Sequence, residues 1–308
     1  MKPPKFYLSK VSLLSPMSSA NLSAGFDVLG VALDAYYDEL DIELDDKPDE
    51  VVVNTNVNLP EENTAKRAAV LFKQKLQFKG KIEVYLKKGI PAGKGLGSSG
   101  SSASGVVYGL NLAFGAPLSE NELVDIAARS ELSPHADNVS ASLLGGFAFV
   151  YSREPYSAFS IYRDWEFIIV IPDVETPQWK TESLRKKLGE PVSYDVYLAE
   201  KYAFNSILRG LIYDDKKSFG EGMSVESYHQ IVRASTGLYS DYLRSKKELI
   251  NAGALGVCIS GAGPSFLVLP GDKMDESVVE GVLKEKQVEA KVVKAKVSKG
   301  IKVIGKEV

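Results

Sequence analysis

The sequence predicts an α+β protein with two domains, and three observations lead to this fold class. At 308 residues the chain is long for a single hydrophobic core. Strand-like alternation of apolar and polar residues dominates the first fifty residues. Beyond Pro172 the pattern changes to helices followed by paired strands. A boundary near residues 155–175 therefore separates an N-terminal domain, expected over residues 1–165, from a C-terminal domain over residues 166–308.

Up to Pro172, the predicted elements are bounded by recognisable helix caps. Asn63 or Thr64 caps a helix that Gly80 ends, because an amide or hydroxyl oxygen satisfies free backbone N–H groups at a helix start. Residues 119–122 form a capping box for another helix, which ends near Glu131. The helix capped by Asn63 or Thr64 is predicted over residues 65–78, and a further helix is predicted over residues 106–114. The predicted strands are VSLL, LGVALDAYYDELDIEL, VVVN, residues 81–86, LLGGFAFVY and EFIIVIP.

The second half of the chain is predicted to be helical first and then to form strands. It contains no internal repeat and no low-complexity tract. The predicted helices are residues 195–212, 221–234, 238–251 and 276–287, and the predicted strands are residues 257–260, 266–269 and 290–297.

Composition and charge exclude several classes of protein. The chain is 44% hydrophobic and 25% charged, which is typical of a globular protein, and its net charge of −3 gives no support for nucleic-acid binding. The single cysteine, Cys258, excludes an internal disulfide and a cysteine-based zinc site, and its apolar neighbours predict a buried structural thiol. No apolar run approaches the roughly 18 residues of a membrane span, and the N-terminus lacks the apolar segment of a signal peptide. We therefore expect a cytoplasmic protein that binds neither membrane nor nucleic acid.

The run PAGKGLGSSGSSASG, from Pro91 to Gly105, is the most informative segment. Eleven of the thirteen residues from Gly93 to Gly105 are Gly, Ser or Ala, and the run lies between a predicted strand and a predicted helix. Glycines let successive backbone N–H groups point into one concavity, and a following helix adds positive charge at its N-terminus. A flexible linker has a similar composition but seldom opens directly into an amphipathic helix. The run therefore predicts a phosphate site.

Two common nucleotide-binding patterns do not fit this run. Residues 95–100 match G-x-G-x-x-G, but Pro91 precedes them and no regular βαβ alternation follows. The Walker A pattern fails because only three residues separate Gly89 from Gly93, and Gly95 follows the lysine where Ser or Thr is required. Neither a Rossmann domain nor a P-loop is expected.

Four segments in order resemble the motifs of a known kinase family. SPMSSANLSAGFDVLG (residues 15–30), PAGKGLGSSGSSAS (91–104) and CISGAGPSFLVL (258–269) resemble the three motifs of the GHMP small-molecule kinases. HADNVSASLLGGF (135–147) is similar to the signature of the homoserine kinases within that superfamily. Mevalonate kinase-type relatives tend to carry Lys or Arg shortly after the proline of the first motif, where this chain has Met17 and Ser18.

The resemblance implies both a fold and an activity. The N-terminal domain would have a ribosomal-protein-S5-like fold and bind ATP, and the C-terminal domain would be ferredoxin-like. The implied reaction transfers the γ-phosphoryl group of ATP to the hydroxyl of L-homoserine, in threonine biosynthesis. The implied cofactor is Mg²⁺, and the implied assembly is a homodimer.

In this resemblance the glycine-rich segment wraps the phosphates of ATP. Ser99 and Glu131 would hold Mg²⁺, since hydroxyl and carboxylate oxygens are the hard ligands that this ion takes. Only three residues separate Glu131 from His135, where the family usually has a longer loop, so Asp125 and Asp137 are alternative ligands. The implied ATP contacts are Asn63, Pro91, Gly93, Lys94, Gly95, Leu96, Gly97, Ser98, Ser99, Gly100, Ser101, Gly261 and Gly263.

Two of these contacts also have a simple structural interpretation. Asn63, which resembles the adenine side of the family's site, also fits a helix N-cap, and both roles can hold together. The GAGPS segment that contains Gly261 and Gly263 also fits a plain hairpin turn. In the family this segment supports the first motif and approaches the substrate.

Homoserine is a zwitterion, so its site needs a carboxylate for the ammonium group and arginine for the carboxylate. The implied substrate contacts are Asn21, Asp27, His135, Asn138, Arg185 and Arg233. Arg209 and Arg244 are alternative candidates for the position of Arg233, and His229 is expected to be structural.

A general base is missing from the predicted site. Mevalonate kinase-type relatives use an Asp with a nearby Lys, but here the lysine is absent and we expect Asn138, rather than Asp137, to face the substrate hydroxyl. An amide does not usefully accept a proton, so the hydroxyl proton would pass directly to the phosphoryl group, which a loose transition state permits. The expected catalytic residues are Asn138, Asp27 and Ser99.

Two other functions remain open from the sequence. Another GHMP kinase, of the mevalonate or shikimate type, would also act on a small alcohol that carries a carboxylate. A GHMP-fold binding or regulatory protein would have lost catalysis, although the intact glycines, Ser99 and Asp27 favour a kinase.

Overall fold

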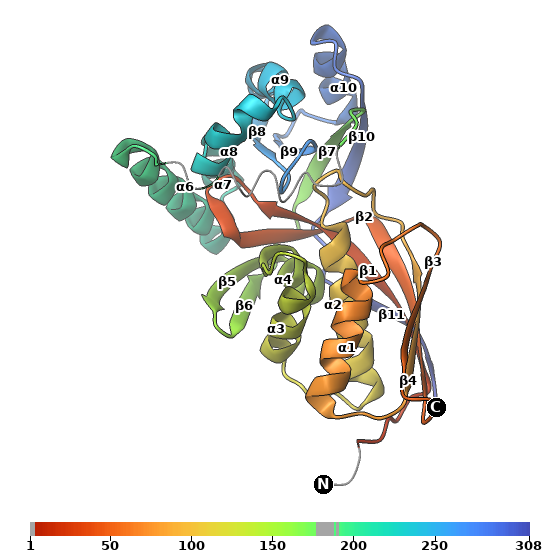
Figure 1. Cartoon of the computed structure of the whole chain (residues 1–308). Coiled ribbons are helices and arrows are strands. Elements are labelled where there is room, and N and C mark those ends of the chain that lie inside the picture. Colours follow the sequence, from red (N-terminus) through yellow and green to blue (C-terminus); the bar gives the residue numbers. More distant parts are fainter. Residues whose placement is uncertain (1–3, 177–187, 189–190) are drawn as a thin grey trace.

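Two β-sheets organise the chain in a computed structural model that describes residues 4–176, 188 and 191–308 (Figure 1). Within these residues the strands form one seven-stranded and one four-stranded sheet. Helices pack on both sheets, and strands and helices are mixed along the whole chain. The α+β fold class predicted from the sequence is confirmed.

The first sheet carries most of the N-terminal half. Its long central strands are β1 (Lys10–Asn21) and β2 (Gly25–Asp45), which pair antiparallel along nearly their whole length. The main path of the sheet runs β11-β1-β2-β4-β3, and β5 pairs with β2 and with β6. The remaining strands are β3 (Val51–Thr55), β4 (Lys81–Lys87), β5 (Phe147–Arg153), β6 (Tyr156–Ile161) and β11 (Lys302–Glu307).

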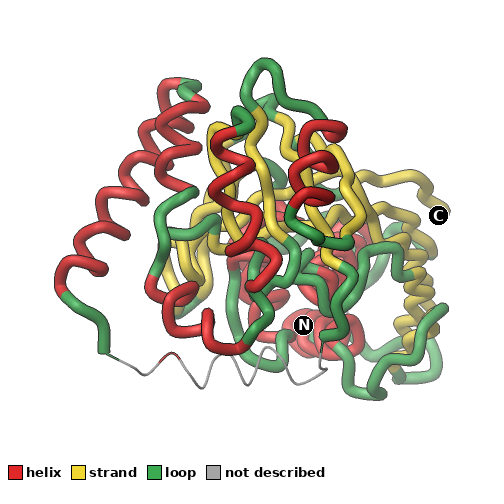
Figure 2. The backbone as a smooth tube through the Cα atoms, turned by 90° about the horizontal axis from the view of Figure 1, so that it is seen from above, coloured by secondary structure: helices red, strands yellow, loops and turns green. Residues whose placement is uncertain are grey.

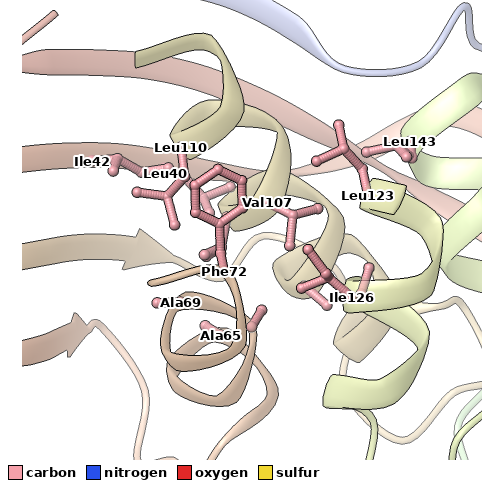
Figure 3. Close-up of a cluster of buried hydrophobic side chains, with 14 of the residues drawn as sticks. Leu40, Ile42, Ala65, Ala69, Phe72, Val107, Leu110, Leu123, Ile126 and Leu143 are labelled. Atoms are coloured by element: carbon pink, nitrogen blue, oxygen red, sulfur yellow. The ribbon is translucent and has the colours of Figure 1, made fainter. Parts of the chain in front are cut away.

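Four helices pack together against this sheet and enclose the first hydrophobic core. They are α1 (Thr64–Leu76), α2 (Ser98–Ala113), α3 (Glu120–Ser130) and α4 (Asp137–Leu144). Figure 3 shows that Phe72 of α1 and Leu110 of α2 meet the side chains of Leu40 and Ile42 from β2. Burial of this apolar surface fixes α2, whose N-terminus faces the glycine-rich loop, against the sheet.

The second sheet has the order β10-β7-β9-β8, and its strand pairs are antiparallel. This order, with helices between β7 and β8 and between β9 and β10, is that of a ferredoxin-like split β-α-β unit. The strands are β7 (Glu166–Pro172), β8 (Ala254–Ile259), β9 (Phe266–Pro270) and β10 (Ala290–Lys296). The helices are α6 (Tyr194–Tyr213), α7 (Lys216–Met223), α8 (Tyr228–Arg233), the 3₁₀ turn η2 (Ala234–Thr236), α9 (Ser240–Asn251) and α10 (Glu276–Glu285).

The two faces of the second sheet belong to different cores. Buried residues of α9 and α10 cover one face, and the other face packs on α6, α7 and the inner residues of β1 and β2. Figure 2 shows the longest helix, α6, at the left edge of the molecule. Since Met17 and Val31 of the first sheet share a core with Phe167 and Leu267 of the second, the two sheets are held together by apolar contacts.

The predicted elements are present, with differences that have physical reasons. Helix α2 begins at Ser98, inside the glycine–serine run, and not near residue 106. Helix α1 ends because Gln77 adopts a left-handed conformation (φ 57°), before Gly80 is reached. The helix predicted over residues 221–234 is divided into α7 and α8, and α4, β6 and β11 were not predicted. Because β11 pairs with β1, the end of the chain returns to the first sheet, and the division at residues 165 and 166 stays a prediction.

Candidate functional site

The glycine-rich loop adopts a left-handed backbone at alternate residues. Gly93, Gly95 and Gly97 have φ angles of 72°, 78° and 67°, which residues with a Cβ rarely adopt. A Cβ on Gly97 would also meet the hydroxyl of Ser18 and lie 2.8 Å from Asn138 Oδ1. Larger residues are therefore excluded at Gly97 by protein atoms, and not only by the space that a phosphate would need.

The carbonyl groups of the loop point into the protein. The oxygens of Lys94, Gly95 and Leu96 accept hydrogen bonds from Ser265 N (3.3 Å), Ser260 Oγ (2.7 Å) and Ser18 N (3.3 Å), respectively. In a trans peptide the C=O and the following N–H point in opposite directions. The N–H groups that follow these three carbonyls therefore face away from the protein, as a cradle for an anion requires.

Helix α2 starts directly from this cradle. Gly97 is its N-cap and makes no side-chain cap, so the first N–H groups of the helix have no capping side chain. Ser99, in the first turn, is exposed, and its carbonyl oxygen lies 3.4 Å from the Thr64 hydroxyl at the start of α1. The positive end of the helix and an exposed hydroxyl are therefore available to a ligand at this point.

Several other small residues of the run contact neighbouring elements, and the ATP contacts expected of Gly100 and Ser101 stay predictions. Ser101 is buried and forms two hydrogen bonds with Ser15 of β1. The Ser101 hydroxyl donates to the Ser15 carbonyl oxygen (3.0 Å), and the Ser15 hydroxyl donates to the Ser101 carbonyl oxygen (2.8 Å). A Cβ on Gly100 would lie 3.0 Å from that of Asn138 in α4, and one on Gly105 would lie 2.8 Å from Leu40 Cδ1. Small residues here allow α2 to approach β1, β2 and α4 closely.

A buried ion pair under the start of α2 was not found from the sequence. Lys88 Nζ pairs with Asp38 and donates to the Ser98 carbonyl oxygen (2.6 Å) and to Ser102 Oγ (2.8 Å). Asp38 Oδ1 accepts from the N–H groups of Gly89 (3.1 Å) and Ile90 (3.3 Å). Burial lowers the pKa of Lys88, and the charges of Asp38 and Glu131 act in the opposite direction. The alternating strand pattern around both residues gave no signal that they would meet.

Glu131 is the candidate carboxylate with unused bonding capacity. It is the C-cap of α3, only 4% exposed, and its Oε1 is buried without a hydrogen-bond partner among the described residues. Asp125 binds Arg129 Nε through both oxygens (2.9 Å each) and accepts Tyr156 N (2.9 Å), while Asp137 accepts Asn138 N (2.7 Å). A buried carboxylate oxygen with no donor fits a site that a cation completes.

No cluster of three or more His, Cys, Asp or Glu side chains suited to a metal occurs in the described residues. Mg²⁺ needs no such cage, because it keeps several waters and takes one or two carboxylates together with phosphate oxygens.

The segment from the end of β1 to the start of β2 concentrates unusual backbone conformations. Asn21, Leu22, Ser23 and Asp27 have positive φ angles of 76°, 39°, 67° and 59°. The Asn21 side chain holds the turn, because its Oδ1 accepts Asp27 N (3.1 Å) and its Nδ2 donates to the Gly261 carbonyl oxygen (3.1 Å). Non-glycine residues in this region are costly and cluster at functional sites. The turn therefore places Asp27 beside the GAGPS segment.

Helix α4 brings the HADN segment to the same place. Asn138 lies at its start, and its Oδ1 accepts a hydrogen bond from the Ser18 hydroxyl (3.0 Å). His135 precedes the helix, with Nδ1 2.7 Å from the Ser133 carbonyl oxygen and Nε2 3.8 Å from Asp137 Oδ1. Asn138 therefore stands between the first motif and the glycine loop.

Arg233 is buried at the end of α8, with 3% of its surface exposed. Its guanidinium carbon lies 5.3 Å from the ring centre of Phe26, the neighbour of Asp27, and the ring of His229 is stacked on Phe26 at 4.9 Å. Burial of the phenol raises the pKa of Tyr239, and the charge of Arg233 and a hydrogen bond with it act in the opposite direction. The structure therefore joins Arg233 to the first motif through an aromatic contact.

The other predicted contacts lie as follows. Asn63 is the N-cap of α1, as expected, because its Oδ1 accepts Lys66 N (3.1 Å), and its role near adenine stays a prediction. Lys94 Nζ donates to the carbonyl oxygens of Pro172 (2.9 Å) and Val174 (2.8 Å), which ties the loop to the end of β7. Arg185 lies outside the described residues.

Comparison with known proteins identifies the family. Residues 63–146 match the GHMP kinases N terminal domain, and residues 207–289 match the GHMP kinases C terminal domain. A homoserine kinase of Thermoplasma volcanium is 37% identical over 276 residues, which cover 86% of each chain. The chain belongs to the homoserine kinases of the GHMP family.

Other homoserine kinases cover still more of the chain. The homoserine kinase of Saccharolobus solfataricus is 34% identical over 94% of this chain and 97% of its own. The crystal structure of homoserine kinase from Cytophaga hutchinsonii has a TM-score of 0.84 at 28% identity and covers 97% of this chain and 99% of that chain. These matches confirm the two-domain GHMP kinase fold and the family resemblance seen in the motifs.

Membership of the family defines the class of ligand. GHMP kinases use ATP, and homoserine kinases act on a small molecule. None of the helices that the structure describes combines the length and the apolar character that crossing a bilayer would need.

Proposed function

We propose that this protein transfers the γ-phosphoryl group of ATP to the hydroxyl of L-homoserine, giving O-phospho-L-homoserine for threonine biosynthesis. The observation that carries the proposal is the meeting of Gly97, Ser18 and Asn138, which joins the phosphate loop to the homoserine kinase segment of α4. Membership of the homoserine kinases favours this acceptor over mevalonate or shikimate and favours an enzyme over an inactive binding protein.

The ATP phosphates would lie on the N–H groups between Gly93 and Ser99 and on the N-terminus of α2. When bound, Mg²⁺ would neutralise the developing charge on the transferring group. We assign its protein ligands to the Ser99 hydroxyl and the Glu131 carboxylate. Glu131 Oε1 has no hydrogen-bond partner in the part of the chain that the structure describes, which supports this choice over Asp125, whose oxygens accept from Arg129 and Tyr156.

The homoserine ammonium group would pair with Asp27, and its carboxylate with Arg233 and Arg185. Asn21 and His135 would line the same site. A buried guanidinium beside an aromatic ring is well suited to a planar carboxylate, since it can donate two parallel hydrogen bonds. Reading both ends of the substrate by charge would favour an amino acid over an uncharged alcohol.

No general base is needed in the proposed reaction. The described hydrogen bonds of Asn138 include no lysine, and its amide does not accept a proton. The hydroxyl oxygen would form a bond to the γ-phosphorus while the bond to the ADP oxygen breaks. The hydroxyl proton would move to an oxygen of the transferred phosphoryl group. Protein groups then contribute position and electrostatic stabilisation.

The deciding experiment measures steady-state ADP release with L-homoserine, mevalonate and shikimate. Turnover with homoserine alone supports the proposal, and turnover with another alcohol assigns a different GHMP kinase. ATP binding without turnover of any acceptor would refute enzymatic function. We also propose a homodimer, as the family resemblance implies; light scattering that gives the mass of a single 33.5 kDa chain would contradict it.

A further inference from the structure

Ser18 occupies the point where three segments of the site meet. It lies in β1 and is fully buried, and its hydroxyl is 3.0 Å from Asn138 Oδ1 and 3.3 Å from the Asn138 carbonyl oxygen. A Cβ on Gly97 would meet the same hydroxyl. The first motif, the phosphate loop and α4 therefore contact one another through a single serine side chain.

Ser142, one turn further along α4, contacts Ser18 and fills the space beside its hydroxyl. The single hydroxyl hydrogen of Ser142 is directed to the Pro16 carbonyl oxygen (3.0 Å), and its Oγ lies 3.3 Å from Ser18 Oγ. The hydroxyl of Ser18 also has one hydrogen, and its shortest contact is the one to Asn138 Oδ1 (3.0 Å). Its contacts with Ser142 Oγ and with the Asn138 carbonyl oxygen are both 3.3 Å, so we infer that the hydrogen is donated to Oδ1.

An asparagine amide has one accepting end and one donating end. When Ser18 occupies the oxygen, the two N–H bonds of Nδ2 are directed to the other side. Gly97 and Gly100 pack against Asn138, so there is little room for the side chain to turn. The direction of the amide is therefore set by Ser18 and the close approach of α2.

We propose that Ser18, supported by Ser142, is a positioning residue that presents the Nδ2 of Asn138 to the acceptor hydroxyl. This inference rests on the proposed kinase function. Nδ2 donates a hydrogen bond to one lone pair of the hydroxyl oxygen, and another lone pair attacks the γ-phosphorus. The hydroxyl hydrogen then points to a phosphoryl oxygen, which receives the proton as the P–O bond forms and the bond to ADP breaks.

The first test is kinetic and compares Ser18→Ala with Ser140→Ala. Ser140 lies in the same helix as Asn138, is buried, and its hydroxyl has no hydrogen-bond partner among the described residues, so its loss is a matched control. Ser18→Ala is expected to lower kcat about tenfold, the equivalent of about 1.4 kcal/mol, with KM for ATP and homoserine changed less than twofold. Equal activity of the two variants would overturn the proposal.

A double-mutant cycle separates positioning from a direct role of Ser18. If Ser18 acts through Asn138, the Ser18→Ala/Asn138→Ala double variant has the kcat of Asn138→Ala alone. Independent, multiplicative losses would refute the inference. If Ser18→Ala does not fold, Ser142→Ala takes its place, with an expected loss of about threefold in kcat by the same route; unchanged kcat in that variant counts against the proposal.

The second test does not depend on turnover. The side-chain NH₂ signals of Asn138, assigned by their loss in Asn138→Ala, are expected to shift or broaden in Ser18→Ala and to stay in place in Ser140→Ala. Unchanged signals in Ser18→Ala would overturn the proposal even if the protein phosphorylates homoserine. Absence of turnover with homoserine in the wild-type protein would instead refute the proposed function. In that case the NMR comparison would still test whether Ser18 positions the Asn138 amide.

Discussion

His229 makes the stability of the fold depend on pH. Its ring is fully buried and stacked on Phe26. Burial, followed by the nearby positive charge of Arg233, lowers the pKa of His229 from 6.5 to about 3, whereas a backbone hydrogen bond with Ser23 acts in the opposite direction. The histidine therefore stays neutral in the folded protein at pH values where the unfolded chain binds a proton.

The direction and size of the effect follow from proton linkage. Between pH 6.5 and about pH 3 the unfolded state binds more protons at this residue than the folded state, so acid favours unfolding. Each unit of pKa difference is worth about 1.4 kcal/mol, so the shift corresponds to about 5 kcal/mol over the whole range. Above pH 6.5 the contribution is constant, and below about pH 3 it no longer changes.

His229→Phe removes the titrating group and keeps a ring to stack on Phe26. We expect the stability difference between wild type and variant to change by about 1.4 kcal/mol per pH unit in favour of the variant as pH falls below 6.5. Equilibrium urea unfolding at pH 7.5, 6.5, 5.5 and 4.5 (roughly one-unit steps) measures this difference while other acid effects cancel. His135→Phe is the control at the chain's other, only partly buried histidine. Parallel pH profiles of wild type and His229→Phe would refute the reasoning.

Three further predictions concern the site. Glu131→Gln should raise the Mg²⁺ concentration needed for half-maximal turnover and lower kcat, with little change in KM for homoserine. Asp125→Asn is the control for this variant. If Glu131→Gln keeps the wild-type Mg²⁺ dependence and Asp137→Asn changes it, the metal ligand is Asp137 and the assignment to Glu131 is wrong. Arg233→Ala should lose roughly 30-fold or more in kcat/KM for homoserine, because an unpaired charge in a closed site costs about 2–5 kcal/mol; an equal loss with an amino alcohol that lacks the carboxylate would contradict this role. Gly97→Ala should lower the unfolding temperature and weaken ATP binding, since its Cβ meets Ser18 and left-handed backbone costs an alanine about 1–2 kcal/mol. Gly237→Ala, which has a similar φ of 77° but nothing within 4 Å of its Cβ, is the control, and equal effects of the two variants would show that the close contact at Gly97 is unimportant.

Local signals in the sequence predicted most of the fold. The capping box at Ser119 and Glu122 is present with both hydrogen bonds, and Asn63 caps α1. Such caps depend on residues three positions apart, which the sequence shows directly. In contrast, β11 pairs with β1 across almost the whole chain, and no local pattern reveals a pairing at that distance.

The same distinction applies to the site. The glycine run predicted a phosphate loop because left-handed turns require a particular residue type in a short segment. The buried pair of Lys88 and Asp38 depends on strands that meet only in the folded sheet, so neither residue could be distinguished from a surface charge. Ser18 was noted only as the place where relatives carry a basic residue. Its contact with Asn138 across 120 positions appears only in the structure.

The glycines of α2 carry a cost that the site explains. Gly inside a helix is less stable than Ala by about 0.5–1 kcal/mol, yet α2 contains Gly100, Gly105 and Gly109. A Cβ on the first would crowd Asn138, and Cβ atoms on the other two would lie within 3 Å of Leu40 or Ile42. The helix that holds the phosphate loop at its N-terminus therefore lies as close to β2 and α4 as backbone allows. Close packing fixes the distance between the start of α2 and the Asn138 amide, and the proposed transfer depends on that distance because it relies on the position of the reacting groups.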